Sequence, residues 1–335
     1  MKRDKLDTQD RRDFSPDEGN LFAAGWFALR RVDESGSILD IDTRIHLSSA
    51  QLNAEVSPFG SELVRLTAGT NELLWSGDPA VWNGHAPILF PIIGMLNHGQ
   101  YRLDGAEFSM PKHGFARTSL FDLVEQNQES VTLRLQDSHE TRASYPFSFR
   151  LDIKFELTAT ALSVTARVTN LDARDMPVSF GFHPAFRWPL PFGAARSEHR
   201  VIFAVDEPAP IRRMDDHGLL RSAAYPSPVQ GKTLRLNDNL FVDDAIIFDG
   251  LRSRALDYGA DGTPSIAVDF ADLPDLGIWT KPGANFICLE PWQGFNDPEG
   301  FEGDIWAKPG IVAIAPAATR EFSMNISIKG LPNDC

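Results

Sequence analysis

The sequence predicts an all-β protein, a β-sandwich of unusually large size. Three observations support this fold class. Apolar and polar residues alternate with a period of two in several segments, short turn sequences recur along the chain, and no long stretch keeps the 3.6-residue periodicity of an amphipathic helix. The 25 glycines and 23 prolines among 335 residues fit many turns and argue against a helix-rich α/β fold.

The N-terminal part differs from the rest of the chain. Residues 1–20 carry five basic and six acidic side chains and almost no apolar ones, so we expect disorder there. Leu21–Arg31 could form a short amphipathic helix or an added strand. We therefore expect a partly disordered N-terminal extension over residues 1–43. One β-sandwich domain is expected over residues 44–331, because no repeat or linker divides that part.

The strand predictions rest on alternation, which is expected where one face of a strand is buried and the other is solvated. Phe149–Leu157 is the clearest case, with every odd position apolar and every even position charged. The same pattern occurs in Val131–Leu135, Leu162–Val168 and Phe322–Ile328. Turn residues that separate such segments are found at Asn170–Asp172, Asp249-Gly250, Asp261-Gly262 and Lys281–Gly283.

The charge and cysteine content exclude several classes of function. Asp and Glu number 46 against 32 Lys and Arg, and the formal net charge of -14 repels nucleic acid and anionic membrane surfaces. The most apolar run, Ala86–Leu96, is shorter than the roughly 20 residues of a membrane span, and no secretory signal peptide is readable. The two cysteines, Cys288 and Cys335, exclude a disulfide framework and a cysteine-rich zinc site, and they favour a reducing, cytoplasmic setting.

Three ionisable residues stand out in apolar, turn-rich segments. His113 lies between Pro111 and Gly114, where the backbone is expected to be irregular; a loop histidine without a role is the alternative. His183 lies among phenylalanines, where a neutral core histidine is the default interpretation. Glu290 follows an apolar run, and function is slightly favoured because burial of a carboxylate is costly without partners.

The same three residues, His113, His183 and Glu290, also form a conceivable zinc or iron ligand set. No HxH, HxxxH or HExxH spacing brings two ligands together on one element, however. We therefore expect no metal.

Six segments in the same order along residues 45–330 resemble the aldose 1-epimerase (galactose mutarotase) family, and the bacterial branch with HGFAR and APILFP segments is the most similar. The resemblance implies a large antiparallel β supersandwich with an open sugar cleft. It also implies an isomerase that interconverts the α and β anomers of an aldohexose without a cofactor. The segments are Trp82–Gly94, Pro111–Arg117, Tyr145–Phe149, Phe180–Phe186, Asp243–Phe248 and Gly277–Gly294.

The resemblance also implies roles for individual residues. His183 corresponds by position to the general acid, Glu290 to the general base, and His113 to a second histidine that holds the ring oxygen. Asp244, with Asp243 as the alternative, resembles an aspartate that binds a ring hydroxyl.

Relatives commonly carry arginine where this chain has His85 and Met95. Arg117 is expected to supply the positive charge instead, and His85 could serve as a donor. Trp82, Trp279 and Trp292 are candidates for packing against the sugar, with a core role as the alternative for each.

Mutarotation needs a proton to leave O1 and another to reach the ring oxygen O5. A Glu290 carboxylate and a His183 imidazolium would provide this pair at neutral pH. The alternatives are a hexose-6-phosphate 1-epimerase and a non-catalytic carbohydrate-binding or regulatory module. A glycoside hydrolase is disfavoured because it normally needs a second carboxylate. Free aldohexoses are the expected partners, bound by a monomer or homodimer.

Overall fold

The computed structural model describes residues 31–32 and 38–331, and antiparallel strands form most of it, which confirms the predicted fold class. Over these residues the helices are one α-helix, α1 (His139–Ser144), and the short 3-10 helices η1 (Asn97–Gly99), η2 (Ala116–Thr118), η3 (Arg196–Glu198), η4 (Asp238–Phe241) and η5 (Ile305–Ala307). No helix in the described part of the chain is long and apolar enough to cross a membrane.

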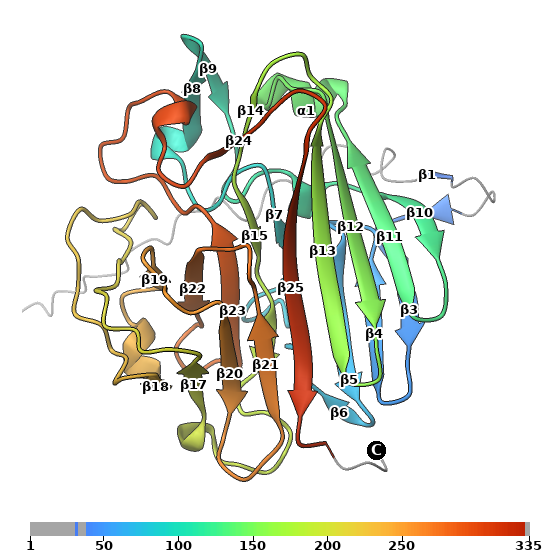
Figure 1. The fold of residues 1–335 in the computed structure, drawn as a ribbon, viewed down its shortest axis with the longest axis vertical. Coiled ribbons are helices and arrows are strands. Elements are labelled where there is room, and N and C mark those ends of the chain that lie inside the picture. Colours follow the sequence, from blue (N-terminus) through green and yellow to red (C-terminus); the bar gives the residue numbers. More distant parts are fainter. Residues whose placement is uncertain (1–30, 33–37, 332–335) are drawn as a thin grey trace, which may run out of the picture.

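The largest sheet has nine strands, in the order β10-β11-β12-β13-β25-β21-β20-β17-β18. Its long central strands are side by side in Figure 1. The strands are β10 (Asp122–Gln126), β11 (Ser130–Gln136), β12 (Phe149–Leu157), β13 (Ala161–Asn170), β25 (Thr319–Lys329), β21 (Ser265–Asp269), β20 (Ala255–Gly259), β17 (Arg200–Phe203) and β18 (Thr233–Arg235).

A second sheet follows the order β19-β22-β23-β15-β7, and β16 also pairs with β23. A third has the order β3-β4-β5-β6, and three two-stranded pairs complete the fold. The second sheet contains β19 (Ile246–Phe248), β22 (Asp275–Trp279), β23 (Phe286–Gln293), β15 (Phe180–Phe182), β7 (Ile88–Leu89) and β16 (Ala185–Arg187). The other strands are β3 (Ile45–Ser48), β4 (Leu52–Ser57), β5 (Glu62–Ala68), β6 (Asn71–Glu72), β8 (Gln100–Leu103), β9 (Ala106–Ser109), β14 (Met176–Val178), β24 (Val312–Ile314), β1 (Arg31–Val32) and β2 (Ile38–Leu39).

The predicted alternation is confirmed in the large sheet. Strand β12 has the bounds expected from the sequence, and all its odd-numbered residues are buried. β11, β13 and β25 contain the other three predicted strands. The turn after β13 forms as expected, because the Asn170 side-chain oxygen accepts a hydrogen bond from the Asp172 N–H at 2.8 Å.

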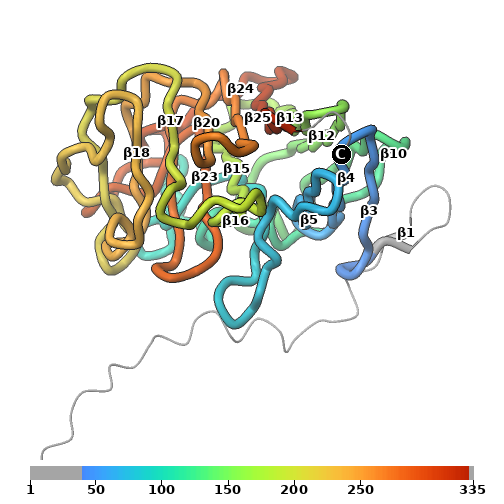
Figure 2. Tube along the Cα trace, turned by 90° about the horizontal axis from the view of Figure 1, so that it is seen from below, coloured from blue at the N-terminus to red at the C-terminus, as the bar shows by residue number. Residues whose placement is uncertain are grey.

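The sheets pack into layers around a large apolar core. Figure 2 shows β3–β5 as a separate layer beside β12 and β13. One cluster of buried residues joins the two layers. It contains Leu52 and Leu63 from β4 and β5, and Phe155 and Val164 from β12 and β13. Most of the expected extension over residues 1–43 lies outside the described residues, and of the possible element at Leu21–Arg31 only Arg31 is described, as the first residue of β1. The division at residue 44 therefore stays a prediction.

Candidate active site

Strand β23 supplies one face of the candidate site. All eight of its residues are buried. Because side chains of a strand point alternately to opposite faces, Phe286, Cys288, Glu290 and Trp292 share one face. The neighbouring strand β22 places Gly277 opposite Glu290, and the lack of a side chain at Gly277 leaves room for the Trp292 ring to pack there.

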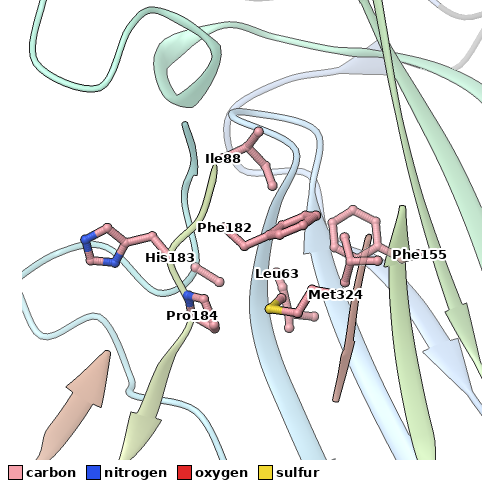
Figure 3. Close-up of a pocket in the computed structure, with 9 residues that line it drawn as sticks. Leu63, Ile88, Phe155, Phe182, His183, Pro184 and Met324 are labelled. Atoms are coloured by element: carbon pink, nitrogen blue, oxygen red, sulfur yellow. The ribbon is translucent and has the colours of Figure 1, made fainter. Parts of the chain in front are cut away.

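An interruption between two short strands brings His183 to this carboxyl group. Gly181 of β15 pairs with Trp292, and Ala185 of β16 pairs with Cys288, so His183 comes opposite Glu290. Pro184 has no N–H to donate and breaks the ladder between the two strands. Figure 3 shows the His183 ring on the side of the strand opposite to Phe182, whose ring lies near Phe155 and Met324.

His183 and Glu290 form a close, buried pair. Nε2 of His183 lies 3.0 Å from Oε2 of Glu290, and the two side chains are 9% and 2% exposed. The two atoms are close without the alignment of a hydrogen bond. In the described part of the chain, Glu290 Oε2 and His183 Nδ1 have no hydrogen-bond partner. The structure therefore unites the two residues that the sequence analysis singled out as acid and base.

Burial changes which member of the pair holds the proton. Loss of water around the carboxyl group raises the pKa of Glu290 well above its ordinary value, a rise that the charge of Lys112 opposes and that of Asp244 strengthens. Burial also lowers the pKa of His183 to about 3, and the charges of Arg117 and Lys112 add to this effect. Burial thus favours a protonated Glu290 carboxyl and a neutral His183 imidazole over the carboxylate and imidazolium expected from the sequence. Both arrangements contain the same number of protons.

His113 stands beside this pair. Its ring is 5.9 Å from that of His183, centroid to centroid, at an interplanar angle of 88°. The Gly94 N–H donates to His113 Nδ1 at 3.0 Å, and the His113 N–H donates to the Gly94 carbonyl at 2.9 Å. Since Nδ1 accepts, the neutral ring carries its proton on Nε2. Burial lowers the pKa of His113 well below its ordinary value, which keeps the ring neutral.

The backbone of His113 is irregular, as its flanking residues predicted. Its φ angle of 66° lies in the left-handed region, which residues other than glycine adopt uncommonly. The two hydrogen bonds to Gly94 hold this conformation. His113 is therefore buried and held to Gly94 by one hydrogen bond to its ring and one from its backbone.

Two of the three candidate tryptophans line the pair. The Trp82 ring lies 5.3 Å from His183 at an interplanar angle of 31°, and the Trp279 ring lies 6.1 Å away at 77°. Both are partly exposed, so they can offer ring surface to a ligand. Trp292 is 3% exposed and packs with Leu89, Ile93 and Ile247. The structure therefore gives Trp292 a packing position rather than an exposed ring face.

The remaining candidates lie at different places around the site. Asp244 is exposed, and its charge acts on Glu290, which favours it over Asp243 as the residue that faces the pair. Arg117 is half-buried, and its charge acts on both His113 and His183. These two residues therefore bring one negative and one positive charge toward the same site.

His85 is oriented toward a different residue. Its Nδ1 lies 3.8 Å from Oε1 of Glu62, the same oxygen that accepts hydrogen bonds from the N–H groups of His85 and Ala86 at 2.7 and 2.9 Å. Its ring also lies against Gly77. The structure thus shows His85 beside Glu62, and its expected role as a donor to the sugar stays a prediction.

Sequence reasoning missed Cys288. Its sulfur, one ring nitrogen of His183 and one carboxyl oxygen of Glu290 all lie within 4.8 Å of one another, and all three residues are buried. The signal was present, because Cys288 precedes Glu290 by two positions and strand alternation places both side chains on one face.

Comparisons with known proteins agree with the fold and with the sequence resemblance. The family model described as aldose 1-epimerase matches residues 43–308. The chromosomal protein LacX of Lactococcus lactis subsp. lactis is 33% identical over 296 residues, which cover 85% of this chain and 99% of that protein. A galactose mutarotase-like protein from Lactobacillus casei is 30% identical with a TM-score of 0.79, covering 85% of this chain and all of that one. A galactose mutarotase related enzyme from Lactobacillus acidophilus is 26% identical with a TM-score of 0.79, covering 87% and 99%.

Proposed function

Since the chain belongs to the aldose 1-epimerase family, we propose that it is an isomerase that interconverts the α and β anomers of an aldohexose. The observation that carries this proposal is the buried contact of 3.0 Å between His183 Nε2 and Glu290 Oε2. Two groups that exchange protons at this distance, beside two partly exposed tryptophans, suit the opening of a hemiacetal ring. A module that only binds sugar would not need such a pair.

The reaction requires the transfer of two protons. When the ring opens, the O1 hydroxyl loses its proton, the C1–O5 bond breaks, and O5 gains a proton. In the proposed assignment the Glu290 carboxylate takes the proton from O1, and the His183 imidazolium gives one to O5. This step converts the ion pair into the neutral pair that burial favours. After rotation about C1–C2, closure on the other face of the aldehyde reverses both transfers and restores the ion pair.

His113 is proposed to position the sugar. Because Gly94 occupies its Nδ1, the ring can donate from Nε2, which suits a hydrogen bond to the ring oxygen. Its lowered pKa keeps it neutral, so it holds O5 without competing with His183 for the proton-transfer step. We assign His113 to orientation of the ring oxygen on this basis.

The surrounding residues are proposed to contact the rest of the sugar. Trp82 and Trp279 would pack against its apolar face, and Asp244 would accept a hydrogen bond from a ring hydroxyl. Arg117 and His85 complete the proposed binding residues, and Trp292, expected from the sequence to touch the sugar, is instead proposed to support the sheet by packing. No cofactor takes part in this acid/base route.

A hexose 6-phosphate is the second candidate substrate. Lys112 and Arg117 bring positive charge toward the pair, and a phosphate group would pair with such side chains. The excess of acidic residues in the chain favours an uncharged sugar.

The direct test is polarimetry of freshly dissolved α-glucose and α-galactose with and without the protein. Faster decay of the optical rotation is expected in its presence. An unchanged decay for both sugars, together with measurable sugar binding by calorimetry, would show a carbohydrate-binding protein instead.

A further inference from the structure

Cys288 lies at the centre of the candidate site, although the proposed reaction does not use it. It is on β23 two residues before Glu290 and pairs with Ala185, which follows His183 by two residues. The sulfur therefore faces the same space as the acid/base pair. The three possible ligand atoms of His183, Cys288 and Glu290 lie within 4.8 Å of one another.

One carboxyl oxygen in this cluster lacks a hydrogen-bond partner. In the residues that the structure describes, Glu290 Oε2 is buried and makes no hydrogen bond, although it lies 3.0 Å from His183 Nε2. The Glu290 side chain is 2% exposed, so water does not replace the missing partner freely. Buried polar groups are normally satisfied, and groups that are not call for an explanation such as a ligand or ion.

We propose that His183, Cys288 and Glu290 form a binding site for a zinc-like divalent cation. An imidazole nitrogen, a thiolate and a carboxylate are established zinc ligands, and three protein ligands leave a fourth position for water. Binding releases the protons of the Cys288 thiol and the Glu290 carboxyl to solvent, because only the deprotonated groups are ligands. The resulting thiolate and carboxylate each carry one negative charge, so together they neutralise a divalent cation. A neutral complex suits a buried site, where an unbalanced charge is costly.

The geometry requires only a small adjustment. Zinc–ligand distances of about 2.0 to 2.3 Å in a tetrahedron place the ligand atoms about 3.3 to 3.8 Å apart. The His183–Glu290 contact is already 3.0 Å, and the widest separation in the cluster is within 4.8 Å. Shifts of about 1 Å in the side chains would close the set. Trp75, Ala284 and Phe286, which pack with Cys288, give the site an apolar outer shell.

A bound cation would switch off the acid/base pair. The metal would occupy lone pairs of His183 and Glu290 that otherwise move protons, so sugar turnover would stop while the metal is bound. This consequence rests on the proposed function, whereas metal binding itself does not. The site thus predicts an isomerase that is inhibited by zinc and restored by a chelator.

Cobalt(II) provides a probe that is independent of sugar turnover. The full-length, reduced, metal-free protein is titrated with cobalt chloride. One equivalent should produce thiolate-to-cobalt charge-transfer absorption and tetrahedral d–d bands, which zinc should remove by displacement. Cys335→Ala, a control at the other cysteine of the sequence, should keep the charge-transfer band. Cys288→Ala should lose it, and Cys288→Ser should lose it as well.

Zinc inhibition of turnover gives the second readout. The zinc concentration for half-inhibition should rise at least about tenfold in Cys288→Ala, because one of three ligands is lost. A wild-type protein without the charge-transfer band, or a band that persists in both Cys288 variants, would overturn the proposed site. If the protein proves to have no epimerase activity, the cobalt spectrum still decides whether the site exists, so the two proposals fail separately.

Discussion

Replacement of Glu290 by glutamine tests the proposed mechanism most directly. Glutamine has the shape of the protonated carboxyl group that burial favours, but it cannot take the proton from O1. A positioned proton transfer typically contributes about 10² to 10⁴ in rate, so turnover should fall by at least about 10². Sugar affinity should stay within a few fold, because the amide keeps hydrogen-bonding capacity at the same place.

The same substitution should not destabilise the protein, and the sign follows from the pKa. Burial raises the folded-state pKa of Glu290 above the ordinary value of 4.5, so the folded state retains a proton that the unfolded chain releases. This contribution to stability is fully present below pH 4.5 and is lost as the pH rises through the folded-state pKa. Each pKa unit of difference corresponds to about 1.4 kcal/mol. Glutamine does not ionise, so the variant does not lose this stability as the pH rises. At pH 7 Glu290→Gln should therefore be at least as stable as the wild type.

The assay combines polarimetric rates, calorimetric sugar binding and thermal unfolding at pH 5 and pH 8. Asp275→Asn is the matched control, because Asp275 is another buried carboxyl on the same sheet, with a pKa raised by burial to about 7 and a hydrogen bond from the Gly294 N–H. The control should keep its activity. Wild-type turnover in Glu290→Gln would remove Glu290 as the base and refute the mechanism.

Four further predictions follow from the same geometry. The pH profile of kcat/KM should be a broad bell. Activity should fall near pH 3, where neutral His183 takes a second proton into the pair, and again well above the ordinary carboxyl range, where Glu290 loses the shared proton. A fall on the acid side between pH 6 and 7 would contradict this order. His183→Asn should lower turnover far more than sugar binding, His113→Asn should lower both, and His199→Asn, a buried histidine outside the site, should lower neither; polarimetry and calorimetry compare them. Glucose or galactose should outcompete glucose 6-phosphate in binding, and the reverse order would implicate Lys112 and Arg117. Removal of residues 1–20 should leave the melting temperature and the sugar turnover nearly unchanged, and a large loss of either would show that the segment contributes to the fold or the site.

The strands that were predictable from the sequence are those with one solvated face. Phe149–Leu157 alternates strictly because its even-numbered charged residues lie at the surface of the large sheet while the odd-numbered ones fill the core. Phe286–Gln293 is buried along its whole length, so no period-two pattern marks it as a strand. This segment could be singled out from its resemblance to the family, but not from alternation of apolar and polar residues.

The site was only partly predictable for a related reason. His183, His113 and Glu290 could be proposed from their apolar surroundings and from the resemblance, but their mutual distances depend on which strands pair. The break at His183-Pro184 between β15 and β16 has no clear signature beyond the proline. From the sequence, Cys288 could be considered only for disulfides, for a cysteine-rich zinc site and for the redox compartment, because its relation to Glu290 emerges once β23 is known to be a strand.

Two glycines explain why the pair becomes so strongly desolvated. The Trp292 ring lies across both neighbours of β23: a Cβ atom at Gly181 would be 2.5 Å from its Cδ1, and one at Gly277 would be 2.5 Å from its Cη2. Gly277 is the residue opposite Glu290, so the ring that rests on it also covers space beside the carboxyl group. Burial of the carboxyl group as a whole is the main cause of the raised pKa of Glu290. The absence of two side chains on the flanking strands thus lets one tryptophan pack beside the proposed base, in surroundings whose burial favours its neutral form.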